Sequence, residues 1–201
     1  TESFTPQAAR SGKSFIPLRG EQWELGVKYE PKDRGVAFSA ALFSLTEKHQ
    51  IAEPLPNVFN QLGLTRTRGL ELEAKGAVTD RLDVLASYNL TRLDEQLEGQ
   101  PMHLASVWAK YRFSLAGVQG FSVGAGLRWA SGFTDKLGGQ GPQVPAVSLV
   151  DTVIAYDAEH WRYALNINNL TDETYNSTCL ARGDCWFGAR RNVTVSATYR
   201  F

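Results

Sequence analysis

The fold class is decided by residues 21–30, whose sequence is EQWELGVKYE. Every second position of this stretch carries an apolar or aromatic side chain: Trp23, Leu25, Val27 and Tyr29. Polar residues and a glycine fill the positions between them, so the two sets of side chains point in opposite directions. A period of two is typical of a β-strand with one apolar and one polar face. The turn-forming run PKDRG at 31–35 predicts a tight reversal after it.

The same alternation returns along the chain and predicts about nine strands. They cover residues 21–30, 36–46, 70–76, 82–90, 105–113, 121–129, 150–156, 161–167 and 193–201. Short turns and long loops rich in polar residues, Gly or Pro alternate between these strands. No helical period of comparable strength is present, so the predicted fold class is all-β and antiparallel.

Alternation alone fits two architectures equally. In a soluble sandwich the apolar stripes face a core, whereas in a transmembrane antiparallel β-barrel they face lipid. Outer-membrane barrels have short turns at the periplasmic end and long loops outside, with aromatic residues near both strand ends. This asymmetry favours the barrel. We therefore expect a set of side chains to point outward: Trp23, Leu25, Val27, Tyr163, Leu165, Val195 and Tyr199.

The composition excludes several other classes of protein. The chain has 201 residues, with 21 Lys plus Arg and 21 Asp plus Glu, so its formal net charge is zero and no nucleic-acid partner is indicated. A hydrophobic content of 43% is too high for a disordered chain. The mean hydropathy is −0.27. No apolar run approaches roughly 18 residues, which excludes a membrane-spanning helix.

Nothing in the sequence indicates catalysis, a bound metal or a cofactor. The three histidines, His49, His103 and His160, lie far apart and match neither a catalytic triad nor a zinc-binding spacing. Serine residues occur without the glycine-flanked turn that activates a nucleophile. We therefore predict a protein that is not an enzyme, with no metal site and no cofactor.

An odd number of strands is unusual for a complete bacterial barrel, which has an even number and both ends inside. If the chain ends in the periplasm at Phe201, counting strands backward places residues 1–20 outside the cell. Residues 1–6 are too few for a tenth strand, which needs roughly 9–11 residues to span the membrane. We expect the C-terminal part of a larger barrel. The alternative is a small barrel with an even number of strands, one of them miscounted.

Several segments resemble the TonB-dependent siderophore receptors, nearest the ferric-hydroxamate (ferrichrome-type) group. They are SFIP at 14–17, GEQWELGVKY at 20–29, TRGLELE at 67–73, PMHLASVW at 101–108, NNLTDETY at 168–175, and the cysteine loop 179–188 with the strand that ends at Phe201. The resemblance covers nearly the whole chain, and the order of the segments together with the C-terminal phenylalanine makes it specific.

The resemblance implies a 22-stranded barrel plugged by an N-terminal globular domain, of which residues 1–201 form about the last nine strands. It implies an outer-membrane receptor and transporter of the bacterial cell. The transported ligand would be a ferric siderophore, and TonB with its inner-membrane complex would supply the energy. The plug domain and the TonB box are absent from this chain, and outer-membrane lipid is the other expected partner. The alternative is a small passive or structural outer-membrane barrel.

The two cysteines lie in a loop that we expect to be extracellular. Cys179 and Cys185 are predicted to form a disulfide, because the protein is exported and no further metal ligands lie nearby. Gly183 and Asp184 between them favour a reversal of the chain.

Four apolar residues are candidate contacts for the siderophore. Phe133, Trp186 and Phe187 are aromatic residues in predicted outer loops, and they offer apolar area to a ligand that already saturates its iron. In ferrichrome-type receptors the residue after the first loop cysteine faces the ligand. The resemblance therefore implies Leu180, which is aliphatic where an aromatic is expected. For each of the four, packing within the loops is the alternative role.

Overall fold

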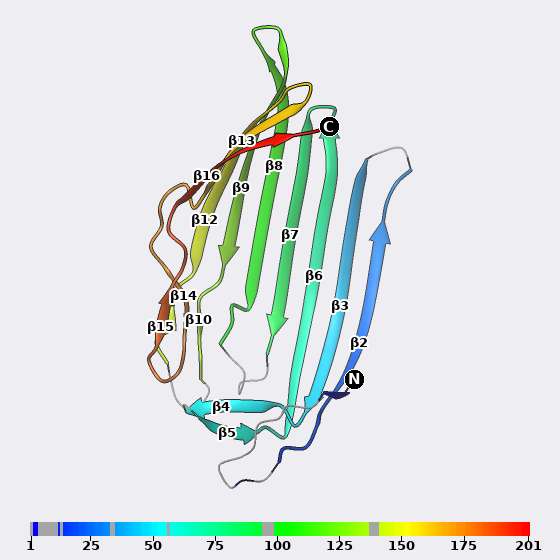
Figure 1. Ribbon diagram of the computed structural model, residues 1–201. Coiled ribbons are helices and arrows are strands. Elements are labelled where there is room, and N and C mark those ends of the chain that lie inside the picture. The colour runs from blue at the N-terminus through cyan, green and yellow to red at the C-terminus, as the bar shows by residue number, and fades with distance from the viewer. Residues whose placement is uncertain are drawn as a thin grey trace.

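The computed structural model describes residues 2–3, 12, 14–32, 35–55, 57–93, 99–136 and 141–201 (Figure 1). Its main element is an antiparallel sheet of ten strands, in which each strand pairs with the next of the series. In spatial order they are β1 (Glu2–Ser3), β2 (Leu18–Tyr29), β3 (Val36–Lys48), β6 (Leu64–Thr79), β7 (Leu82–Arg92), β8 (His103–Leu115), β9 (Val118–Ala130), β12 (Val147–Asp157), β13 (Trp161–Asn168) and β16 (Asn192–Tyr199). In the part of the chain that is described, no helix could cross a membrane.

All nine predicted strands are present, and several are longer than the alternation indicates. β6 begins at Leu64, whereas the apolar pattern starts only near residue 70. Its first residues still pair with β3, ending at Lys48 opposite Leu64. The backbone ladder therefore continues beyond the stretch in which side chains alternate between apolar and polar.

Three short hairpins inside the long loops were not predicted. They are β4 (Ile51–Leu55) with β5 (Val58–Gln61), β10 (Phe133–Thr134) with β11 (Gln143–Val144), and β14 (Asn176–Cys179) with β15 (Cys185–Phe187). Strands of two to five residues are too short to display a period in the sequence.

The short turns all lie at one end of the sheet and the long loops at the other (Figure 1). Between β8 and β9 the turn consists of Ala116 and Gly117, both with positive φ (50° and 78°). Positive φ at both central residues is the geometry that matches the twist of a two-residue hairpin. Between β6 and β7 the Thr79 hydroxyl accepts hydrogen bonds from the amides of Arg81 and Leu82. The predicted alternation of short turns and long loops is confirmed.

One face of the sheet, here called the apolar face, is hydrophobic and exposed. It carries the alternating residues of β2 and their cross-strand partners, so that Leu25 lies opposite Leu42 and Leu42 opposite Leu70. Trp23 is 81% exposed and Val195 78%. Among the described residues only a few hydrophobic side chains are buried, so this face does not pack against a second sheet. The soluble sandwich is therefore wrong, and the outward orientation of the predicted residues is confirmed.

The opposite face, here called the polar face, carries charged and small side chains. Ser87 and Ser106 form a hydrogen bond across β7 and β8 with their hydroxyl oxygens 2.8 Å apart. The large aromatic Trp108 lies across Gly124 and Gly126 on the neighbouring strand, where a Cβ on Gly126 would stand 2.2 Å from the ring. Glycine at these two positions lets an indole lie flat on the sheet.

Aromatic rings form a band on the apolar face at the short-turn end. The rings of Phe121 and Tyr156 stack with centroids 4.6 Å apart. Neighbouring rings continue the band in both directions: Tyr111, Phe113, Trp161, Tyr163, Tyr199 and Phe201. Such bands occur where barrel strands pass through a membrane–water interface.

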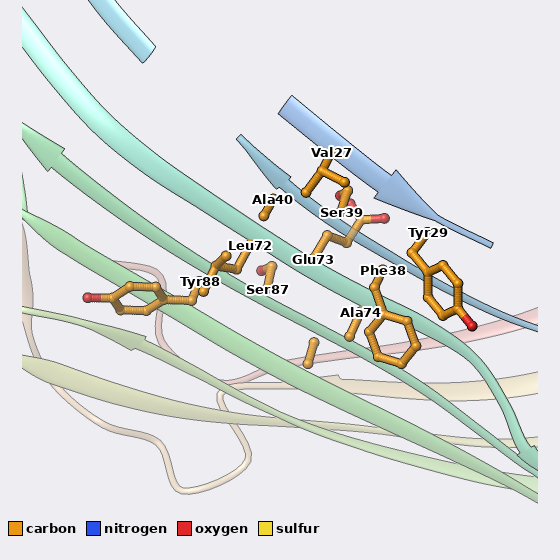
Figure 2. Close-up of a pocket in the computed structure, with 11 residues that line it drawn as sticks. Val27, Tyr29, Phe38, Ser39, Ala40, Leu72, Glu73, Ala74, Ser87 and Tyr88 are labelled. Carbon is orange, nitrogen blue, oxygen red and sulfur yellow. The ribbon is translucent and has the colours of Figure 1, made fainter. Parts of the chain in front are cut away.

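A shallow apolar groove of about 400 Å³ crosses the same face over β2, β3, β6 and β7 (Figure 2). Figure 2 shows the stacked pair Tyr29 and Phe38 at one end and Tyr88 at the other. The small side chains of Ala40 and Ala74 lie between these larger ones, which is why the surface is hollowed here.

The two ends of the sheet are not joined to each other among the described residues. β1 pairs with β2 at one end, and β16 pairs only with β13 at the other. The β2–β16 pairing that a small closed barrel requires is not found in this part of the chain. From the predicted stub at residues 1–6, Glu2–Ser3 forms a two-residue strand, and residues 1 and 4–6 lie outside the described residues.

Candidate ligand-facing loops

The predicted site residues lie on two of the long loops, residues 131–146 between β9 and β12 and residues 169–191 between β13 and β16. Figure 1 shows β10 of the first loop near β14 and β15 of the second, at the end of the sheet opposite the short turns. β11 contacts β14 directly. The two loops therefore form one connected region.

The second loop carries a hairpin closed by a disulfide, here called the cysteine hairpin (residues 176–187). Cys179 and Cys185 are bonded, with sulfurs 2.06 Å and Cα atoms 4.1 Å apart. At its tip the Leu180 amide donates to the Asp184 carbonyl (2.8 Å), and the Gly183 amide donates to the Leu180 carbonyl (2.9 Å). Gly183 has a φ of 99°, which favours glycine. The predicted disulfide is confirmed.

Asn169 holds the two ends of this loop together. It adopts a left-handed backbone (φ 52°), which asparagine tolerates better than most residues, and it is 2% exposed. Its side-chain Oδ1 accepts from the Glu173 amide (2.8 Å). Its Nδ2 donates to the carbonyls of Glu173 (2.9 Å) and Ala189 (3.1 Å). The amide thus links the start of the loop to its end.

An ion pair also links the two ends of this loop, here called the loop base, on the side exposed to solvent. The Asp172 carboxylate accepts from Arg190 Nε (2.9 Å) and Nη2 (2.6 Å), and from the Arg191 amide (3.0 Å). These donors, the Arg190 guanidinium first, hold the pKa of the Asp172 carboxyl well below its usual range. The same hydrogen bond raises the pKa of Arg190. Asp172 is therefore ionised in the folded protein at neutral pH.

A second, half-buried pair connects the loop base to the polar face. Arg128 of β9 donates to Asp151 of β12 through Nε (2.6 Å) and Nη2 (3.0 Å). Asp151 Oδ1 also accepts from the Asn169 amide (2.9 Å). A bidentate pair of this kind is among the stronger charge-assisted contacts. The loop base is therefore anchored to two strands of the sheet.

Three of the four predicted ligand contacts lie on the cysteine hairpin. Leu180 is half-buried at its tip, while Trp186 and Phe187 on β15 are exposed, Phe187 by 77%. Phe133 on β10 of the neighbouring loop is half-buried. It lines a cavity of about 320 Å³, whose lining does not include the three hairpin residues.

Sequence reasoning missed Tyr175 as a member of this region. Tyr175 and Arg128 line the cavity together with Phe133. The Tyr175 ring also lies over Gly188, where a Cβ would stand 2.0 Å from the ring. The Gly188 amide donates a hydrogen bond to the Tyr175 carbonyl (2.8 Å). Its position at the end of the segment NNLTDETY is the sequence feature that could have identified it.

No group of three or more His, Cys, Asp or Glu side chains that could hold a metal ion occurs among the described residues. Both cysteines of the chain are bonded to each other in the disulfide. What the region presents is exposed aromatic and aliphatic surface on a braced hairpin. Such a surface suits binding of a ligand by apolar contact.

Comparison with known proteins assigns this arrangement to a family. The family model described as "TonB dependent receptor-like, beta-barrel" matches residues 1–170. The chain belongs to this family. The predicted resemblance and the all-β fold are thereby confirmed.

Curated receptor proteins resemble the chain along its whole length. It is 34% identical to the ferrichrome outer membrane transporter/phage receptor of Escherichia coli (strain K12), covering 100% of this chain and 29% of that protein. It is 32% identical to the ferrioxamine B receptor of Salmonella typhimurium (strain SL1344), with 99% and 31% covered. The chain thus spans about three-tenths of the length of these relatives.

Solved structures of other receptors share the fold. The pyoverdine outer membrane receptor FpvA from Pseudomonas aeruginosa PAO1 superposes with a TM-score of 0.77 at 23% identity, covering 100% of this chain and 33% of that one. The siderophore receptor PiuA from Acinetobacter baumannii gives 0.77 at 20% identity, with 96% and 30% covered.

Proposed function

We propose that this chain is the C-terminal wall of the barrel of a bacterial outer-membrane receptor that imports a ferric siderophore with energy from TonB. The observation that carries the proposal is the family match over residues 1–170 on a sheet with one exposed apolar face and one polar face. The curated relatives are named as receptors or transporters and not as enzymes. The apolar face is suited to outer-membrane lipid, and the polar face to a lumen.

The ligand class we propose is a ferric hydroxamate siderophore. The relatives at 34% and 32% identity are named for ferrichrome and ferrioxamine B. The exposed aromatic pair Trp186 and Phe187, with Leu180 at the hairpin tip, offers apolar contact area on the long-loop end. Phe133 would contribute from the neighbouring loop. The transported complex is a ligand and not a cofactor.

We also propose that the rest of the barrel, a plug domain and the segment that contacts TonB lie outside residues 1–201. The two unjoined ends of the sheet support this. β16 has an edge available for a further strand, and β1 pairs only with Leu18 and Arg19 on the outer edge of β2, which leaves the rest of that edge for another strand. The coverage of about three-tenths of each relative agrees with it.

The test is growth of the source bacterium on single iron sources. Deleting the gene for the full receptor should abolish growth on ferrichrome or on ferrioxamine B while growth on free iron salts continues, and a plasmid copy should restore it. Growth unchanged on every hydroxamate source would overturn the proposed ligand class.

A tonB-deleted strain separates the receptor from the passive barrel. The proposed receptor stops importing the siderophore when TonB is absent, whereas a passive or structural barrel is indifferent to it. Siderophore uptake that persists in the tonB-deleted strain through this protein alone would support the passive alternative and overturn energised transport.

A further inference from the structure

A buried carboxylate lies where the long loops meet. Asp135 directly follows β10, and only 8% of the residue is exposed. Its Oδ2 accepts a hydrogen bond from the amide of Ala181 (2.9 Å), at the tip of the cysteine hairpin. A carboxylate taken out of water is costly unless donors compensate it, so its burial at a loop junction requires bonds of this kind.

The same residue closes its own loop. The Asp135 carbonyl accepts from the Gly141 amide (3.0 Å). Gly141 in turn lies against the hairpin: a Cβ there would stand 2.7 Å from Ala181 Cα and 2.9 Å from the Leu180 carbonyl oxygen. The loop 131–146 and the tip of the cysteine hairpin are therefore in backbone contact, with no space for a side chain between them.

A third loop reaches the same point. A Cβ on Gly99, in the connection between β7 and β8, would lie 3.6 Å from the Asp135 side chain, at ordinary contact distance. The paired residues of the main sheet end before this junction, at Ala130 and Val147 for β9 and β12. The backbone hydrogen bonds between the strands therefore do not determine how the loop tips are positioned relative to one another.

We propose that Asp135 is a positioning residue that holds its own loop, at Asp135 and Gly141, against the tip of the cysteine hairpin beside Gly99, and so fixes Leu180 in place. Leu180 precedes the amide that Asp135 binds, so this bond sets the position of Leu180 relative to the cavity lined by Phe133. Fixing a loop before the ligand arrives lowers the ordering cost of binding. The role in ligand affinity rests on the function proposed above, whereas the role in loop order does not.

The experiment compares variants of the full receptor by hydrogen exchange without ligand, read at residues 178–188. Asp135→Ala should accelerate exchange of the Ala181 amide by roughly tenfold, because a hydrogen bond to a charged acceptor is lost. Asp135→Asn retains an acceptor oxygen and should restore slow exchange. Asp184→Ala is the matched control, since it removes a carboxylate of the hairpin itself, one that pairs with Arg182 at the surface. It should leave the Ala181 amide unchanged.

A second variant keeps the test decisive if Asp135→Ala does not fold. Gly141→Ala leaves the carboxylate intact but places a methyl group against Ala181, so it should separate the loops and accelerate the same exchange. Siderophore affinity should fall about threefold to thirtyfold in Asp135→Ala and Gly141→Ala but not in Asp184→Ala. Unchanged exchange in both loop variants would overturn the positioning role. Accelerated exchange with no siderophore binding in any variant, wild type included, would instead contradict the proposed function.

Discussion

At the scale of single residues, the loop base depends on Asp172. Its carboxylate faces the guanidinium of Arg190 and the amide of Arg191, which lower its pKa. The pKa of such a carboxyl is lower in the folded protein than in the unfolded chain. Its ionised form therefore stabilises the folded state at any pH above the unfolded-state pKa. This stabilisation is lost as the pH falls through the folded-state pKa.

We therefore predict that the loop base loosens only in strong acid. Because an unfolded aspartate titrates near about 3.9, protease cleavage within residues 169–191 should stay slow down to about pH 4 and rise below it. Asp172→Asn should be cleaved faster at neutral pH and should lose that acid dependence. Limited proteolysis with an acid-stable protease across this range is the measurement. A wild-type profile that already rises between pH 6 and 5 would contradict the assignment.

A second residue-scale prediction concerns the glycines under Trp108. Gly126→Ala should destabilise the barrel by about 1–3 kcal/mol, since the new Cβ would stand 2.2 Å from the indole and overpacking costs are of this size. Gly26→Ala on the same polar face is the control. The nearest atom to its Cβ would be the Ala40 carbonyl oxygen at 3.5 Å, so little change is expected. Denaturant unfolding of the receptor in lipid, followed by tryptophan fluorescence, compares the two. Equal stability of both variants would be evidence against the packing argument.

At the scale of elements, strand β16 tests which face meets lipid. Val193 lies on the apolar face opposite Ile167, in the row of paired residues that crosses β12 at Thr152 and β9 at Ala125, and the adjacent Thr194 lies on the polar face. Val193→Arg should cost about 2–4 kcal/mol of membrane folding free energy, whereas Thr194→Arg should cost much less. Refolding titrations into lipid vesicles measure both. A larger cost for Thr194→Arg would reverse the assignment of the faces.

The cysteine hairpin supports a further prediction at this scale. Replacing Cys179 and Cys185 by Ser removes a constraint worth about 2 kcal/mol on a loop of this length. The strands do not depend on it, so insertion into the membrane should be normal while siderophore affinity falls modestly. Thiol titration of the unreduced wild type should find no free thiol from these two residues. Unchanged affinity of the double variant would show that the bridge has no role in binding.

At the scale of the whole molecule, the ends of the sheet carry a prediction about assembly. Leu25→Cys with Val195→Cys, on β2 and β16, should not cross-link in the folded receptor, because each strand pairs with a different neighbour. Leu165→Cys with Val195→Cys is the positive control, since these positions are directly opposite on β13 and β16. Mobility after mild oxidation reports both. A cross-link between β2 and β16 would indicate a small closed barrel.

The architecture was predictable because it rests on local alternation. The direction of each side chain in a strand depends only on its position, so EQWELGVKYE predicts an apolar and a polar face without knowledge of its neighbours. The nine strands, the two faces and the turn asymmetry followed from repeating this argument. The short hairpins β4–β5 and β10–β11 did not, since two to five residues cannot show a period.

The sequence by itself determined the strands, their two faces and the partner of Cys179, since only one other cysteine is present. The tertiary structure alone decided which loops meet. Asp135 and Ala181 are 46 residues apart, and no local pattern marks an aspartate that will accept a bond from a distant backbone amide. The physical reason is that such contacts depend on the pairing register and curvature of the sheet, which bring the ends of non-consecutive loops together. Side-chain alternation within a strand needs neither.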